Sequence, residues 1–266
     1  MVLGSLRGEI GKMTSLKSDF KKECISNGFA NLAPNYFARC VGNGIFQTIY
    51  TGFKQYISTD SSNYNVQRPK DYYISIGLYS MYTQWPEHVF VPGRNCGGYT
   101  PNNFVGTADE PFEGIEREYK KMLDSGFSVL DSLNSQEKLL EFRNKVMLSS
   151  RNSRIHSFDL VGPYLVCGNI EDALFEINHQ YTHSVVGFFR ENDCLLSSGE
   201  VKKYLSELSA LKERLTEAEC LWVALISCKY DFVHSYLNET FERNCVLARK
   251  NNIPFSSDFH KVTLPL

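Results

Sequence analysis

The order of its sequence patterns is what most constrains the fold of this chain. Three β-branched and aromatic runs, Tyr36–Val41, Ile45–Thr51 and Tyr72–Tyr82, lie in the first third of the 266 residues. From about residue 113 onward, apolar residues recur at the three- and four-residue spacing of amphipathic helices. Strands that precede helices, instead of alternating with them, predict an α+β fold rather than a parallel α/β sheet.

Short connections between the strand-type runs predict an antiparallel β-meander. The first two runs are separated by Gly42-Asn43-Gly44, which has the composition of a tight hairpin turn. A helical pattern from Ser15 to Leu32 precedes them, and Gly28 is placed to end it. We therefore expect an N-terminal helix and a meander, followed by an all-helical C-terminal half.

The helical half contains several helix-start patterns. They are Asn134-x-x-Glu137, the cap Asn169, Ser197-x-x-Glu200 and Thr216-x-x-Glu219. Residues 216–250 contain neither Gly nor Pro, and they are expected to form one long helix or two with a break near 229–231. We expect an α+β region at 1–112, ending in a Gly/Pro-rich loop at 84–112, and a helical region at 113–266, or else one continuous domain.

Charge and hydropathy narrow the classes of partner. The 28 Lys and Arg residues and 30 Asp and Glu residues leave a net charge of -2, so no field attracts polyanions and we expect no nucleic-acid partner. The longest apolar run, Cys220–Ile226, is far shorter than the ~18 residues that suggest a membrane span. No apolar segment of secretory type occurs near Met1, and the eight cysteines form no C-x-x-C pair. We expect a cytoplasmic protein with reduced, structural cysteines, no membrane partner and no cofactor.

Five segments resemble a known bacterial family. They are the opening helix Phe20–Phe29, the hairpin Tyr36–Arg39 with Ile45–Tyr50, the strand Tyr73–Tyr79, and the later segments Leu130–Leu140 and Tyr164–Ala173. Together these segments resemble the family catalogued as domain of unknown function 4304, over roughly residues 15–190. The resemblance implies an α+β fold and a bacterial cytosolic setting. It offers no catalytic residue.

The loop at 84–112 is the main candidate binding site. Its glycines let backbone amides approach a ligand, Arg94 can pair with a carboxylate or phosphate, and Trp85 and Tyr99 are efficient binding aromatics. The alternative interpretation is that the loop only connects two elements and that its aromatic side chains anchor it to the core. Cys96 with His88 as its base would make a nucleophile, although nothing in the sequence indicates a lowered thiol pKa.

A second candidate lies on the helix that follows Asn169. Asp172, Glu176, His179 and His183 fall within about 60° of one another at 100° per residue. The unit Glu176-x-x-His179 matches the building block of helical carboxylate metal sites, and Asp231 with His234 could supply partners. The simpler interpretation is the solvent face of an amphipathic helix.

These observations favour a non-catalytic binding module. We expect it to recognise a protein or a small anionic ligand through Trp85, Arg94 and Tyr99. A bacterial toxin-immunity or defence role is one setting for such a module. The alternative is a metal-dependent hydrolase or oxidase that uses the metal-ligand candidates Glu176, His179, His183, Asp231 and His234.

Overall fold

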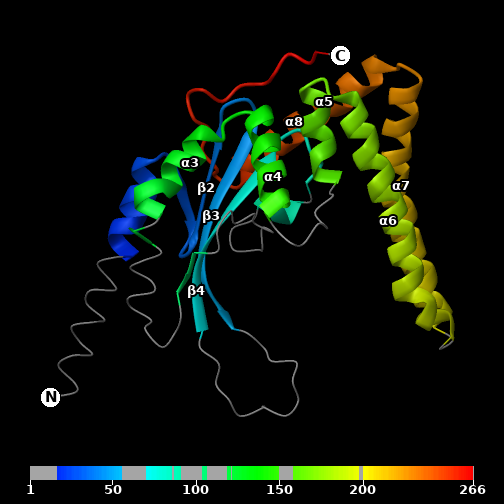
Figure 1. Cartoon of the computed structure of the whole chain (residues 1–266), viewed down its shortest axis with the longest axis horizontal. Helices are drawn as coiled ribbons and strands as arrows, with labels where there is room; N and C mark the ends of the chain where they lie inside the picture. Colours follow the sequence, from blue (N-terminus) through cyan, green and yellow to red (C-terminus); the bar gives the residue numbers. More distant parts are fainter. Residues whose placement is uncertain are drawn as a thin grey trace, which may run out of the picture. The chain divides into compact units, whose positions relative to one another are not determined.

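The computed structural model (Figure 1) confirms the α+β layout, with an N-terminal helix, an antiparallel sheet and then mostly helices. It describes residues 17–55, 70–85, 87–90, 104–106, 119–120, 122–149, 158–197 and 200–265. Contacts divide the chain into two units. The sheet unit takes the described parts of residues 1–79, 85–138 and 245–260, and the helical unit takes 80–84, 139–244 and 261–266. Each unit is therefore built from more than one stretch of the chain.

The sheet is an antiparallel meander in which the strands follow one another in chain order, β1-β2-β3-β4-β5. The strands are β1 Ala30–Ala33, β2 Tyr36–Val41, β3 Ile45–Gln55, β4 Lys70–Ser80 and β5 Phe104–Gly106. The three predicted strands are confirmed as β2, β3 and β4. Two short strands were not expected: β1 replaces the predicted last turn of the opening helix, and β5 lies inside the Gly/Pro-rich region.

The N-terminal helix, residues 17–26, ends at the glycine that the sequence indicated. Gly28 has a φ of 79°. The backbone N–H of Phe29 donates to the Cys24 carbonyl at 3.0 Å, and that of Gly28 donates to the Ile25 carbonyl at 3.0 Å. This is the paired hydrogen bonding of a glycine-terminated helix. It turns the chain directly into β1.

The turn between β2 and β3 can hold only glycine at its first position. Gly42 and Gly44 have φ values of 53° and 84°. A Cβ atom at Gly42 would lie 1.8 Å from the Asn134 carbonyl oxygen. The backbone N–H of Asn43 donates to that same carbonyl at 3.0 Å. The predicted hairpin turn is therefore confirmed, and it is also the contact point for the segment before α4 Gln136–Ser149.

Buried amide side chains tie the sheet to the segments that pack on it. Gln136 donates through Nε2 to the carbonyls of Asn43 and Gly44, at 2.9 and 3.0 Å. Gln47, on β3 and fully buried, donates through Nε2 to the Leu130 and Leu133 carbonyls at 2.7 and 3.0 Å. The two Gln47 bonds add to the capping of α3 Phe127–Ser132, whose Leu130 carbonyl also accepts from the Leu133 backbone N–H.

Residues 254–256, which follow the last helix, form backbone hydrogen bonds to β2. The backbone N–H of Cys40 donates to the Pro254 carbonyl, and that of Ser256 donates to the Cys40 carbonyl, both at 2.8 Å. β1 pairs with β2 only as far as Ala38. Residues 254–256 therefore bond to β2 beyond the point where β1 stops.

The helical unit contains most of α4, the short helix α5 Val161–Val166, α6 Ile170–Ser197, α7 Val201–Ile226 and α8 Tyr230–Lys250 up to residue 244. The 3-10 turn η4 Phe158–Leu160 precedes α5. The sheet unit has two further short elements, the 3-10 turn η2 Glu87–Phe90 and the π-helical turn η3 Met122–Gly126. The long helices α6 and α7 lie side by side and antiparallel (Figure 1). None of the helices in the described ranges is long and apolar enough to cross a membrane.

One predicted helix start is wrong, a second lies a few residues later than predicted, and one predicted break is confirmed. Ser197 ends α6, and Glu200 precedes α7 without a side-chain cap bond. Thr216 lies inside α7, where its hydroxyl donates to the Lys212 carbonyl at 2.8 Å instead of capping a new helix. The break near 229–231 is present because Cys228 adopts a φ of 52°, which ends α7 before α8 begins.

Candidate functional site

The loop candidate lies mostly outside the described residues. Arg94, Tyr99 and Cys96 all fall in the undescribed 91–103 segment. Trp85 is half-buried, and its ring stands edge-on to the buried Tyr79 ring with centroids 5.0 Å apart. This contact is what we expect if the loop is a structural connection whose aromatic side chains anchor it to the core.

The acid and imidazole line on α6 is not a uniform solvent face, which corrects the simpler interpretation. Asp172 and His183 are exposed and His179 is half-buried, but Glu176 is only 4% exposed. The rings of His179 and His183 stack with centroids 6.2 Å apart. Glu176 therefore faces inward, while His183 faces solvent.

The five proposed metal ligands do not form a metal centre. All five lie within the described ranges, where no group of three or more His, Cys, Asp or Glu side chains could hold a metal ion. Asp231 is exposed and His234 is half-buried on α8. The structure therefore does not support the metal-dependent alternative. The buried Glu176 carboxylate instead interacts electrostatically with a protein cation.

That cation is Arg143 of α4, which is 2% exposed. Its guanidinium lies 4.0 Å from the Asp159 carboxylate. Burial lowers the pKa of Arg143 to about 10, against the attraction of Asp159 and Glu176, so the group stays protonated at neutral pH. Burial also raises the pKa of Tyr164 beside it, as do Asp172 and Glu176. We interpret this cluster as a structural link from α4 to α6, because its central charge is closed to solvent.

A second cluster surrounds Glu217 on α7. Its carboxylate accepts a hydrogen bond from the Tyr236 hydroxyl, and the Gln84 amide, with its nitrogen turned to the carboxylate, donates to it at 2.9 Å. Burial raises the pKa of Glu217 above its usual range, although the Tyr236 bond and Arg243 oppose that shift. This acid has partners that position it, but it lines neither of the two cavities of this unit described next.

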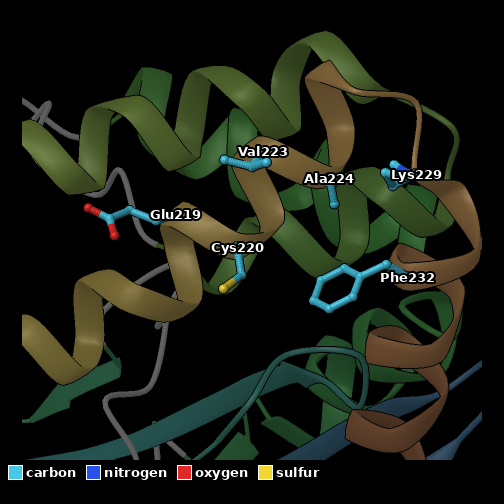
Figure 2. A pocket seen from close by; sticks show the side chains of 6 residues that line it. All are labelled: Glu219, Cys220, Val223, Ala224, Lys229 and Phe232. Atoms are coloured by element: carbon cyan, nitrogen blue, oxygen red, sulfur yellow. The ribbon is translucent and has the colours of Figure 1, made fainter.

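The first cavity opens between α7 and α8, with a volume of about 430 Å³. Its lining residues are Glu219, Cys220, Val223, Ala224, Lys229 and Phe232. Figure 2 shows the Phe232 ring of α8 directed toward the part of α7 that carries Cys220, with Glu219 at one end and Lys229 at the other. Phe232 is 46% exposed and Val223 is 52% exposed. We name this cavity the α7–α8 pocket. Its floor is apolar, and the oppositely charged Glu219 and Lys229 lie at its two ends.

The second cavity lies between α6 and α7, with a volume of about 260 Å³. It is lined by Ile177, Asn178, Tyr181, Ala218, Glu219 and Trp222. The Tyr181 hydroxyl donates to Glu219 Oε1 at 3.4 Å across the helix pair. Trp222 is 38% exposed, so its ring borders this cavity and solvent together.

The α7–α8 pocket contains one thiol, that of Cys220. Cys220 is exposed and not disulfide-bonded, and the lining includes Lys229, which directly precedes α8, but no histidine. By contrast, burial raises the pKa of the Cys24 and Cys40 thiols, so these behave as small apolar core residues. The pocket can therefore bind apolar groups, and the described residues around it provide no complete catalytic set.

The sequence analysis missed this pocket, although one signal pointed to it. The run Cys220–Ile226 is apolar at seven consecutive positions, and such a run encircles a helix completely. One side of α7 is buried through Leu221, Ala224 and Leu225. The other side must then leave Trp222, Val223 and Ile226 exposed, as the structure has them.

Comparisons with known proteins add no relative. No protein-family model, no curated protein and no solved structure matches the chain. The resemblance to the bacterial family of unknown function stays a prediction.

Proposed function

We propose that this protein is a non-catalytic protein-interaction module whose α7–α8 pocket holds an apolar side chain of a partner protein. The observation that carries the proposal is the exposed apolar floor of this pocket, formed by Val223 and Phe232 at 52% and 46% exposure. Soluble proteins rarely leave large apolar side chains exposed together unless the surface binds something. Aromatic anchors in such pockets dominate the energetics of interfaces.

The chemistry of the pocket favours a protein partner over a small anion. Lys229 is the one cation of the lining, and Glu219 at the other end repels an anion. A matching partner segment presents an apolar side chain with an acidic residue on its Lys229 side and a basic residue on its Glu219 side. The proposal includes a cytoplasmic setting, which the unpaired thiols of the buried Cys24 and Cys40 support.

Site-specific photo-crosslinking tests this function. Benzoylphenylalanine replaces Phe232 in the full-length chain, and the producing cells are irradiated before lysis. We expect one discrete crosslinked product, and we expect the additional change Val223→Asp to remove it. The matched control places the same probe at Val246, an apolar residue of the same helix that is 59% exposed and lies outside the pocket. Absence of a product from position 232, or the same product from position 246, would reject the proposal.

A further inference from the structure

A second apolar surface runs along α7 at coiled-coil spacing. Its positions alternate by four and three residues: Val201, Leu205, Leu208, Lys212, Leu215, Glu219, Trp222 and Ile226. Five of the six apolar members are 38–55% exposed, and Leu215 is half-buried. We call this set the α7 stripe. It spans about 38 Å at 1.5 Å per residue.

The α7 stripe lies beside the seam that α7 shares with α6, and it is not that seam. The seam consists of Leu211, Ala218 and Leu225, which are buried. At 100° per residue the stripe is turned to one flank of it, toward the side on which Trp222 and Tyr181 border the smaller cavity. Phe189 of α6, 57% exposed, falls on this same flank. The α6–α7 pair therefore has an apolar side that is open to solvent.

We infer that a second copy of this chain covers the α7 stripe, with the two α7 helices antiparallel about a two-fold axis at Leu215. An isologous contact must be complementary to itself. In this arrangement Leu205 lies opposite Ile226 of the second copy, Leu208 lies opposite Trp222, and Leu215 meets its own equivalent. Each apolar position of the central stripe then faces an apolar position.

The two charged positions of the stripe select this register. Lys212 lies three residues before the axis and Glu219 lies four residues after it, so each Lys212 faces Glu219 of the second copy. The two copies of Lys212 are then about 9 Å apart along the helix axis. Sliding the helices by one heptad would place one of these two charges opposite an apolar residue and the other opposite its own equivalent in the second copy. A polar pair at the core of a helix interface is a common device for fixing its register.

The inference does not rest on the proposed function. Glu219 is common to both surfaces, but the other pocket residues lie outside the stripe. If no crosslink forms from position 232, the proposed function fails and the dimer inference stands. If the chain is monomeric, the dimer inference fails and the proposed function stands.

Sedimentation of the purified full-length chain over a concentration series tests the inference. We expect a concentration-dependent species of twice the 30.4 kDa chain mass. Lys212→Glu alone and Glu219→Lys alone should each raise the dimer Kd about tenfold or more, because each places like charges opposite one another. The double variant Lys212→Glu/Glu219→Lys should restore the wild-type Kd. The matched control is Lys202→Glu, a charge reversal at an exposed α7 position outside the stripe.

A cysteine pair tests the register directly. Leu215→Cys should form a disulfide between the two copies, because the two-fold axis brings this position next to its equivalent. Leu208→Cys should not, because the two equivalents lie about 21 Å apart along the axis. A chain that stays monomeric throughout the series, or a dimer that Leu205→Asp leaves intact, would overturn the inference. A dimer whose charge variants are not rescued by the double exchange would overturn the register.

Discussion

The sheet unit and the helical unit differ in two kinds of side chain: polar groups that are buried and large apolar groups that are exposed. The sheet unit encloses polar groups and satisfies them: Arg39 is 7% exposed and bonds to Gln47 at 2.8 Å and to Asp131 at 2.6 Å. The helical unit places the buried Arg143 4.0 Å from Asp159, and among the described residues it exposes more large apolar side chains than the sheet unit does. Among these, Val186 is 61% exposed and Phe189 is 57% exposed.

This difference separates residues that stabilise from residues that bind. An enclosed polar group is costly to leave without its partner, so its replacement should lower the free energy of unfolding. An exposed apolar group contributes little to folding, so its replacement should change binding instead. The following substitutions test this distinction in order of decreasing effect.

The largest effect is expected for Gln47→Leu in the sheet unit. This change removes the side-chain donor to the Leu130 and Leu133 carbonyls and the acceptor of the Arg39 Nε–H. We expect the free energy of unfolding to fall by about 3 kcal/mol, measured by urea denaturation followed by circular dichroism. The control Lys22→Ala removes a surface pair with Asp19 and should cost less than about 0.5 kcal/mol. Similar losses for the two variants would mean that the buried amide is not a stabilising element.

A smaller, pH-dependent effect is expected for Glu217→Gln. The folded state raises the pKa of Glu217, so it holds the proton more tightly than the unfolded chain does. Stability therefore falls in the wild type as pH rises past the ordinary carboxyl pKa, and the glutamine variant lacks this loss. We expect the variant to gain stability relative to wild type between about pH 4 and about pH 7. Parallel stability profiles for the two proteins would contradict the burial of this carboxylate.

The smallest effect on stability is expected for Val186→Gln on α6. This side chain is 61% exposed, and glutamine has the higher helix propensity. We expect thermal denaturation to give an unfolding free energy that is unchanged or higher by a few tenths of a kcal/mol. A loss of more than about 1 kcal/mol would show that the exposed apolar residues of this helix stabilise the fold after all.

The elements that could be predicted from the sequence are those with a local sequence pattern. Alternation and the Gly42-Asn43-Gly44 turn were enough for β2, β3 and β4, because their chemistry is local. The strands β1 and β5 have four and three residues, too few to show a period. The Thr216 pattern misled for a related reason, since a mid-helix hydroxyl that bonds back to the previous turn looks the same in sequence as a cap.

The site was less predictable because it depends on tertiary packing. A helical wheel places Glu176 opposite the apolar side of α6, and only the position of Arg143 on α4 shows that this carboxylate is enclosed. The α7–α8 pocket likewise needs the turn at Cys228, which sets Phe232 against Cys220. What the sequence did contain was the uninterrupted apolar run Cys220–Ile226, and its length excluded a membrane span without indicating a binding surface.

The hydrogen bonds between Cys40 and residues 254–256 impose an order on synthesis. β2 leaves the ribosome with the backbone groups of Cys40 still lacking those partners, because Pro254 and Ser256 are made more than 200 residues later. At typical translation speeds of 5–20 residues per second, that interval lasts roughly 10–40 s. For this time the nascent chain presents an open strand edge, the feature through which unfinished sheets associate with one another. The newly made protein therefore depends on its own late segment, or on a chaperone acting before it, to avoid that association.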